Sequence, residues 1–333
     1  MKAYQINSDD GIDALALRDI DTPRPGPYEV LIRVRASSIN YRDLLTVENP
    51  SARNLPIPRI PNSDSAGEIV EVGANVTRFK VGDRVCATFF ESWLDGEITA
   101  SDMTTARGGT AEGMLAEYRA VHENGLVATP AYMSDIEAAT LPCAAVTAWN
   151  SLTRGGVRAG NTVLLLGTGG VSIIALQLCK ALGARVVITS SSEEKLARVC
   201  RLGAWQTVNY RKNPEWQDEV LDITDGHGVD HTVEVGGPGT LQKSIAATRV
   251  GGSIGLIGVL ALGQIDPLPI LMKSQRLHGI YVGSRQMFED MNQALSVHEV
   301  NPVVDATFAL DDAREAYRSM RAADHFGKLV ITL

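Results

Sequence analysis

Two short stretches hold side chains whose types and spacing suit chemistry on a small molecule. The first is "INYRD", residues 39–43, where Asn40, Tyr41, Arg42 and Asp43 directly follow an alternating, strand-like segment. A phenol can donate both a hydrogen bond and a proton, so Tyr41 is the candidate proton donor, and Asn40 is a candidate hydrogen-bond donor to a carbonyl oxygen. Arg42 would bind an anionic or polar substrate or pair with Asp43, which we expect to orient its neighbours. A purely structural alternative makes Arg42 and Asp43 a local ion pair and Tyr41 a packing residue.

The second stretch is "VLLLGTGGVSIIALQLCKALGA", in which an apolar strand runs through a glycine turn into a helix. The first glycine allows the tight turn, the second lets the backbone approach a pyrophosphate, and the helix N-terminus offers free N–H groups. The usual third glycine is Ser172 here. A tight turn without a ligand and a methyl-donor site are the alternatives. We predict a dinucleotide site that includes Gly167, Thr168, Gly169, Gly170 and Val171.

The end of the next predicted strand indicates which dinucleotide is bound. NAD sites usually place Asp or Glu there to accept from the ribose 2′-OH. This chain instead has Ser190, Ser191 and Ser192, with Lys195 in the following helical turn. Glu193 and Glu194 suit the first turn of a helix capped by serine. Hydroxyls and a lysine favour a 2′-phosphate, so we predict NADPH, with NADH as the possible alternative.

The composition excludes several classes of partner. The 333 residues carry 31 Lys and Arg against 39 Asp and Glu, a net charge of −8, which disfavours nucleic acid and anionic membranes. The four cysteines form no CxxC pair, so we expect free thiols. The first residues lack a signal-peptide pattern, and the apolar runs are too short to cross a membrane. We therefore expect a cytoplasmic protein of about two domains, with no membrane partner.

The elements that must position these residues change character along the chain. Alternating segments at 29–36, 66–73 and 83–90 predict a β-rich first part, followed by a long surface loop at 91–113. Beyond residue 127, predicted strands at 162–167, 185–190, 229–237, 253–258 and 277–284 alternate with helical segments. This alternation predicts an α/β fold with a parallel, doubly wound sheet. The tail is predicted to form a helix and then a strand, which either completes this sheet or returns to the first domain.

The order of these motifs resembles a known family. "PGPYEVLIRVRASSINYRDLL", "SDSAGEIVEVGANVTRFKVGDRV", "AATLPCAAVTAWNSL", the glycine turn and "HFGKLVITL" follow one another as in the medium-chain dehydrogenase/reductase superfamily. The chain resembles its quinone oxidoreductase-like and alcohol dehydrogenase-like branch over nearly its whole length. The resemblance implies a GroES-like β-rich catalytic domain, residues 1–126 and 285–333, and a Rossmann domain, residues 127–284.

The resemblance also bears on zinc. In zinc-dependent members, a strand end like "INYRD" supplies a Cys ligand and a Gly-His-Glu motif supplies the next. Here Asn40 stands at the Cys position, Ser63 and Asp64 at the His and Glu positions, and Cys143 alone keeps a ligand type. This is a poor tetrahedral zinc set, and 91–113 lacks the four-cysteine cluster of the family's second zinc lobe. We therefore predict a zinc-independent enzyme. A zinc-dependent alcohol dehydrogenase with atypical ligands and a non-catalytic NADPH-binding sensor or structural protein are the alternatives.

Further site residues follow from the resemblance and from the predicted strand ends. Thr147 resembles the residue that packs against the nicotinamide, although a core threonine is the alternative, and Lys328 resembles a cofactor-contacting lysine, although a surface lysine is the alternative. The other candidate cofactor contacts are Tyr210, Gly236, Gly258, Val259, Val282 and Gly283.

Substrate and assembly follow less directly from the sequence. Tyr41, Phe89, Phe90 and Trp93 are expected to line a pocket for an enone, quinone or aldehyde, in which a C=C or C=O bond is reduced. "LHGIYVGS" at a sheet edge is expected to form a homodimer, as in relatives.

Overall fold

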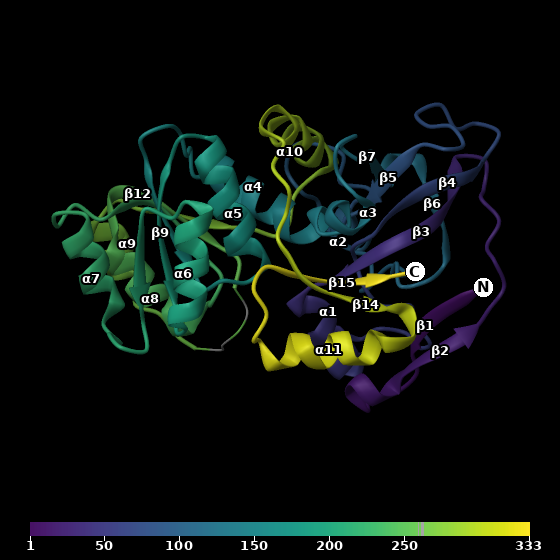
Figure 1. Ribbon diagram of the computed structural model, residues 1–333, viewed down its shortest axis with the longest axis horizontal. Coiled ribbons are helices and arrows are strands. Elements are labelled where there is room, and N and C mark those ends of the chain that lie inside the picture. Colours follow the sequence, from purple (N-terminus) through teal and green to yellow (C-terminus); the bar gives the residue numbers. More distant parts are fainter. Residues whose placement is uncertain (259, 261–262) are drawn as a thin grey trace. The chain divides into compact units, whose positions relative to one another are not determined.

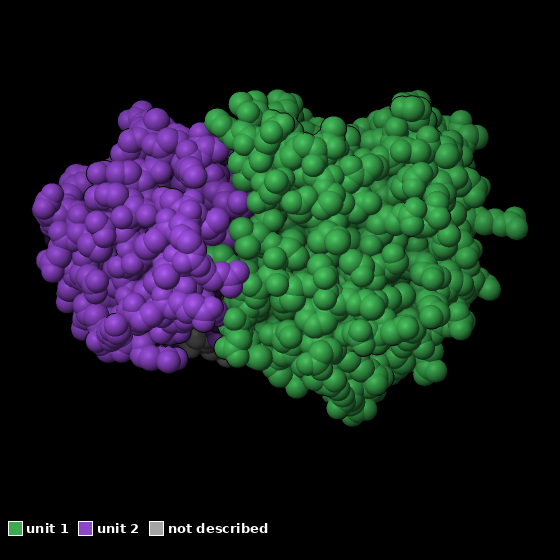
Figure 2. Space-filling view, viewed as in Figure 1, with its two compact units in different colours: residues 1–146, 283–333 green, residues 147–282 purple. Residues whose placement is uncertain are grey.

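The computed structural model describes residues 1–258, 260 and 263–333, which form two compact units (Figures 1 and 2). Unit 1 comprises Met1–Val146 and Gly283–Leu333, and unit 2 comprises Thr147–Val282. The sequence-based domain boundaries fell at 126/127 and 284/285. Residues 127–146 group with unit 1 because helix α3 (Asp135–Ala138) packs against two strands of its sheet, β3 (Glu29–Ile39) and β4 (Ala66–Val72).

Unit 1 is built on a mainly antiparallel sheet of strand order β14-β15-β3-β4-β5-β7, with β6 also paired to β3. Its strands are β3 (Glu29–Ile39), β4 (Ala66–Val72), β5 (Arg84–Ala87), β6 (Tyr118–His122), β7 (Leu126–Ala128), β14 (Val304–Ala309) and β15 (Lys328–Thr332), and β1 (Lys2–Ile6) pairs with β2 (Leu15–Asp19). The predicted strands at 29–36, 66–73 and 83–90 are thus present as β3, β4 and β5. The tail returns to this unit, since β15 lies between β14 and β3 (Figure 1).

Strand β3 contributes to two hydrophobic cores because its successive side chains point to opposite faces of the sheet. Val30, Ile32 and Val34 belong to one buried cluster, while Ile39 belongs to another that includes Tyr317 of helix α11 (Ala313–Ala322). Burying each such aliphatic side chain stabilises the fold by roughly 1.5–3 kcal/mol. The strand that leads into "INYRD" is therefore packed on both faces.

The remaining helices of unit 1 range from four to fourteen residues. They are α1 (Tyr41–Glu48), α2 (Ala100–Met103), α10 (Arg285–His298) and α11 (Ala313–Ala322), together with a π-helical turn at Leu141–Ala145 that contains Cys143. No disulfide joins the four cysteines, as predicted.

The segment 91–113 is only partly the surface loop that its polar composition predicted. Its middle is exposed and carries α2, but Ala106 and Arg107 are buried. Arg107 donates to the Thr88 carbonyl at 3.0 Å and pairs with Glu91 at 2.6 Å. The prediction failed here because a half-buried ion pair and packed glycines carry no periodic hydrophobic signal.

Unit 2 contains a six-stranded sheet of order β10-β9-β8-β11-β12-β13 in which every pairing is parallel. Its strands are β8 (Thr162–Leu166), β9 (Arg185–Ser190), β10 (Gln206–Asn209), β11 (Val229–Glu234), β12 (Thr248–Leu256) and β13 (Arg276–Gly279). Its helices are α4 (Val146–Arg154), which starts at the last residue of unit 1, α5 (Gly170–Ala181), α6 (Glu193–Leu202), α7 (Trp216–Ile223), α8 (Pro238–Ala247) and α9 (Leu268–Met272). The chain order reverses at β8, so the predicted doubly wound sheet is confirmed.

Three strands of unit 2 have bounds that differ from the sequence-based expectation. The strand expected at 229–237 ends at Glu234. The strand expected at 253–258 begins earlier, as β12 at Thr248, which already has an extended backbone (φ −83°, ψ 135°). The strand expected to continue to residue 284 ends at Gly279. Within the described residues, no helix is both long enough and apolar enough to cross a bilayer.

Candidate functional site

The "INYRD" stretch caps a helix. Asn40 is the N-cap of α1, and its backbone N–H donates to the Asp43 carboxylate at 2.9 Å. Asp43 is fully buried and also accepts a hydrogen bond from Arg42 at 3.0 Å. Arg42 donates further to the Arg107 carbonyl at 2.7 Å and lies over the Phe89 ring. Of the two roles left open for Arg42, the structure therefore shows the ion pair with Asp43.

Tyr41 differs from its neighbours because it faces solvent. Its side chain is 40% exposed, and its hydroxyl has no hydrogen-bond partner among the residues that the structure describes. The alternative in which Tyr41 is a packing residue does not fit this exposure. The phenol is available to a ligand.

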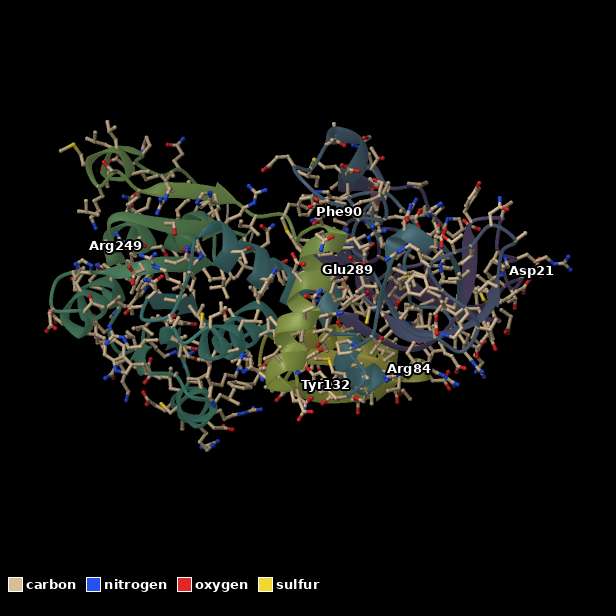
Figure 3. The ribbon with its side chains drawn as sticks, turned by 90° about the horizontal axis from the view of Figure 1, so that it is seen from above. Asp21, Arg84, Phe90, Tyr132, Arg249 and Glu289 are labelled. Carbon is tan, nitrogen blue, oxygen red and sulfur yellow. The ribbon has the colours of Figure 1, made fainter. Side chains whose placement is uncertain are left out.

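The aromatic residues expected to line the substrate pocket lie in the core instead. Phe89, Phe90 and Trp93 are each at most 3% exposed, and they pack edge to face with centroid distances of 4.7 and 5.9 Å (Phe90 is labelled in Figure 3). The prediction was wrong because aromatic side chains after a strand favour burial against one another.

A buried polar cluster surrounds Lys328, the first residue of β15. Its ammonium donates to the Ile39 carbonyl at 2.8 Å and to the Asn40 side-chain oxygen, and it lies 4.0 Å from Asp64 Oδ2. The lysine is only 5% exposed, so the surface alternative for Lys328 is wrong. Asn40, expected to donate to a substrate, instead offers its oxygen to Lys328, and its amide nitrogen lies 3.4 Å from Ser63 Oγ.

Asp64 is the carboxylate of this cluster. It accepts hydrogen bonds from Ser38 Oγ at 3.2 Å, Ser63 Oγ at 2.6 Å and the Cys143 backbone N–H at 3.3 Å. Burial raises the pKa of Asp64, and the positive charge of Lys328 opposes that rise.

These contacts allow a test of whether zinc fits. The four positions that correspond to zinc ligands, Asn40, Ser63, Asp64 and Cys143, are buried or half-buried around an ammonium group that already supplies a positive charge. Burial raises the pKa of the Cys143 thiol, whereas zinc binds the thiolate. The described residues contain no group of three or more His, Cys, Asp or Glu that could hold a metal ion. The residues present do not fit a zinc ion.

The glycine turn of unit 2 is open where a ligand would approach. Gly167 has a left-handed backbone (φ +70°), and a Cβ atom added at Gly167 or Gly169 would meet no atom within 4 Å. Thr168 is buried between them, and Gly170 and Val171 begin α5. Ser172, in place of the third glycine, donates to the Leu166 carbonyl at 2.7 Å. The turn therefore leaves its backbone accessible, as pyrophosphate binding requires.

The glycines at the other strand ends are required by packing instead. A Cβ atom at Gly236 would lie 2.3 Å from Thr240 Oγ1, and one at Gly258 would lie 2.2 Å from the Val235 carbonyl carbon. The buried Glu234 holds this loop, because it accepts from the Gly236 N–H at 2.7 Å and from Thr240 Oγ1 at 2.6 Å. Sequence reasoning missed Glu234, although an acidic residue in the apolar strand "VDHTVEVGG" was the available signal.

The serine-rich end of β9 forms a compact turn. Ser190 Oγ accepts from the Ser192 N–H at 3.3 Å, and Ser192 Oγ caps α6 by accepting from the Lys195 N–H at 3.3 Å. Ser191, between them, is half-buried. Tyr210 follows β10, and its N–H donates to the Ser190 carbonyl at 3.2 Å. The candidates Ser190, Ser192, Lys195 and Tyr210 thus lie at or just beyond the carboxyl ends of the neighbouring strands β9 and β10.

Two further cations lie near these strand ends and were not singled out from the sequence. Arg211 and Lys212 directly follow Tyr210 in the "YRKN" turn, and that cluster of basic residues was the missed signal. Lys212 pairs with Glu193 at 2.8 Å, and Asn209 binds the same carboxylate at 2.5 Å. Arg211 forms no ion pair with any described residue. Three cations, Lys195, Arg211 and Lys212, stand against the two carboxylates Glu193 and Glu194, a local net charge of 3 − 2 = +1.

The remaining candidates are close in sequence to the points where the chain passes from one unit to the other, Val146/Thr147 and Val282/Gly283. Thr147 is buried in α4, as its core alternative requires. Val282 has a left-handed backbone (φ +56°), rare for a β-branched residue, and its carbonyl accepts from Asn150 at 2.7 Å. A Cβ atom at Gly283 would lie 2.7 Å from Val146 Cγ1. Val259 lies outside the described residues.

Comparisons with known proteins agree with this architecture. Residues 26–131 match the alcohol dehydrogenase GroES-like domain family, and residues 170–297 match the zinc-binding dehydrogenase family. The chain is 42% identical to a zinc-type alcohol dehydrogenase-like protein of Schizosaccharomyces pombe, covering 97% of this chain and 96% of that protein. It is 30% identical to a 2-methylene-furan-3-one reductase of Solanum lycopersicum, covering 99% of this chain and 79% of that protein.

The solved structures agree as well. The structure of an NAD-dependent alcohol dehydrogenase is 30% identical with a TM-score of 0.91, and the alignment covers 100% of both chains. The chain therefore belongs to the medium-chain dehydrogenase/reductase superfamily, and the predicted GroES-like and Rossmann architecture is confirmed. Since these relatives are dehydrogenases and reductases, the protein is an oxidoreductase of this superfamily.

Proposed function

We propose that the protein is a zinc-independent, NADPH-dependent reductase that transfers a hydride to an activated C=C or C=O bond. The observation that carries the proposal is the open glycine turn between β8 and α5, whose free space at Gly167 and Gly169 suits a pyrophosphate. A substrate class of enones, quinones or aldehydes is supported by the similarity to a relative named as a furanone reductase.

The preference for NADPH is supported by charge. A 2′-phosphate placed at the end of β9 would meet the hydroxyls of Ser190, Ser191 and Ser192 and the cations Lys195 and Arg211. The nearby carboxylate of Glu193 is engaged by Lys212 and Asn209. An NAD site would instead need a free carboxylate for the ribose 2′-OH.

In this proposal the bound NADPH supplies the hydride. The chain's own residues bind and orient the cofactor and the substrate, and they protonate the product. The glycine turn holds the pyrophosphate, and the serine-rich turn holds the 2′-phosphate. The exposed Tyr41 hydroxyl donates a proton to the reduced substrate. The buried cluster around Lys328 takes the place of a zinc centre.

The first test is a titration of metal-analysed protein with NADPH and NADH, followed by nicotinamide fluorescence. Binding of NADPH at least about tenfold tighter, or ~1.4 kcal/mol, is expected, with turnover of members of an enone, quinone and aldehyde panel. Tighter NADH binding, or stoichiometric zinc with activity lost to a chelator, would instead favour a zinc-dependent alcohol dehydrogenase. Binding without turnover of any substrate would favour a sensor.

We also propose a homodimer formed through β13, the edge strand of the unit 2 sheet. Leu277 on this strand, Tyr281 just after it, and Leu271 and Met272 on α9 are exposed apolar side chains. Edge pairing would cover them and the free backbone groups of the strand. Sedimentation showing a dimer that Leu271→Glu dissociates is expected, and a monomeric wild type would contradict the proposal.

A further inference from the structure

One N–H donor of the Lys328 ammonium group lacks a hydrogen-bond acceptor among the described residues. An ammonium group has three N–H donors, and two of them reach the Ile39 carbonyl at 2.8 Å and the Asn40 side-chain oxygen. The nearest carboxylate oxygen, Asp64 Oδ2, lies 4.0 Å away, beyond hydrogen-bond distance. Within the described part of the chain, the third N–H has no acceptor.

Asp64 balances the charge of Lys328 without using that proton. Its oxygens already accept from Ser38 Oγ, Ser63 Oγ and the Cys143 N–H. A buried ammonium that keeps one unmade hydrogen bond is costly to the fold, since desolvation is not fully compensated. Because the unmade hydrogen bond does not stabilise the fold, it is better explained by the binding of a ligand at this N–H.

We propose that Lys328 is the electrophilic residue of the reaction, and that its third N–H binds the carbonyl oxygen of the substrate. This inference rests on the proposed reductase function and deepens it. When the hydride adds to the carbonyl carbon, or to the β-carbon of an enone, the π bond there breaks. Its electron pair ends on the substrate oxygen as an alkoxide or enolate, which the ammonium stabilises.

The reaction is completed by one proton. It joins the alkoxide oxygen or the enolate carbon, from Tyr41 or from water, while the hydride donor leaves as the oxidised nicotinamide. The substrate must therefore carry a carbonyl oxygen conjugated with, or part of, the bond that is reduced. Enones, quinones and aldehydes meet this requirement, and isolated alkenes do not.

This role differs measurably from the cofactor contact that the sequence suggested for Lys328. If Lys328 only contacted the cofactor, its removal would raise the dissociation constant for NADPH and leave kcat at saturation unchanged. A group that stabilises charge on the substrate oxygen acts on kcat, and removal of one such donor typically lowers kcat by about 10²–10³-fold.

The experiment compares the wild type with Lys328→Met, Lys328→Arg and the control Lys80→Met, a lysine whose side chain is 83% exposed. Two readouts are measured: steady-state reduction of the carbonyl panel with NADPH, and binding of benzoate, an inert carboxylate, to the NADP⁺ complex. We expect Lys328→Met to lower kcat about 10²–10³-fold and benzoate affinity at least about tenfold, with the NADPH dissociation constant unchanged. We expect Lys328→Arg to restore part of the benzoate affinity and Lys80→Met to match the wild type.

The two proposals fail in different ways. A wild type that reduces no member of the panel refutes the reductase function, and the benzoate comparison then decides the role of Lys328 alone. A wild type that binds no benzoate, or Lys328→Met with wild-type kcat or wild-type benzoate affinity, overturns the inference. Because Lys328→Met leaves Asp64 buried without its counter-charge, Lys328→Met/Asp64→Asn is measured as well, with thermal unfolding to show that it folds.

Discussion

His231 should limit the stability of unit 2 in acid. It is fully buried on β11, with Nε2 3.0 Å from Ser151 Oγ and Nδ1 2.8 Å from Ser253 Oγ. Burial, together with the positive charges of His278 and Arg276 on β13, lowers its pKa from 6.5 to about 3. The hydroxyls of Ser151 and Ser253 suit a neutral imidazole, so the histidine is a structural residue and not a general base.

The sign of the effect follows from proton binding. Between pH 6.5 and about 3 the unfolded chain binds a proton at His231 and the folded chain does not, so stability falls as the pH falls. The full pKa difference, 6.5 − 3 = 3.5, corresponds to a loss of roughly 5 kcal/mol in the free energy of unfolding at low pH. Only part of this is lost in mild acid, and the same two pKa values give a loss of about 2 kcal/mol between pH 7 and pH 5.

The assay is urea unfolding of the wild type and His231→Gln at pH 7, 6 and 5, followed by tryptophan fluorescence in a Trp93→Phe background. The signal then comes from Trp149, Trp205 and Trp216 in unit 2. The variant is expected to be less stable at pH 7 and to lose about 2 kcal/mol less than the wild type on going to pH 5. His298→Gln, on α10 in unit 1, serves as the matched control and should keep the wild-type pH dependence. Equal losses in the wild type and His231→Gln would refute the assignment of a buried, neutral imidazole.

Three further predictions concern the ligand site. Ser191→Asp should weaken NADPH binding by at least about tenfold, or ~1.4 kcal/mol, with little effect on NADH binding. If a fluorescence titration gave the wild-type ratio of the NADPH and NADH dissociation constants, the assignment of a 2′-phosphate site to this turn would be wrong. Gly169→Val should weaken both cofactors while keeping the melting temperature, since its side chain would enter open space, whereas Gly236→Val should lower the melting temperature because it would collide with Thr240. Tyr41→Phe should lower turnover about 10²–10⁴-fold, and wild-type turnover would mean that water supplies the proton.

Local patterns were sufficient for much of the fold. Apolar runs separated by glycine turns predicted the parallel strands of unit 2, and alternation predicted β3 and β4 of unit 1. Element ends were harder to place. The short sequence "TRVGG" carries no strong helical or strand period, and pairing of β12 with β11 decides its conformation. The aromatic residues at 89–93 were misassigned because exposure depends on packing partners that are distant in sequence.

The ligand site was predicted unevenly for a similar reason. The glycine turn and the serine-rich strand end are contiguous in the sequence, so their chemistry was visible there. The environment of Lys328 was not, because it depends on register: Leu329 of β15 pairs with Ile39 of β3, which brings the preceding lysine against Ile39 and Asn40. Nothing in either segment alone predicts that a lysine and an asparagine would share a hydrogen bond.

The division of unit 1 into two stretches of chain affects the order in which the protein folds during synthesis. Residues 147–282 are contiguous, so unit 2 has all its strands before the ribosome has made β14 or β15. The edge of β3 that pairs with β15 stays unpaired until then, and Asp64 lacks the positive charge of Lys328. Domains generally fold as units during translation, the N-terminal one first. Here the unit that begins at residue 1 should finish last, and its exposed strand edge is where a nascent chain would most need a chaperone.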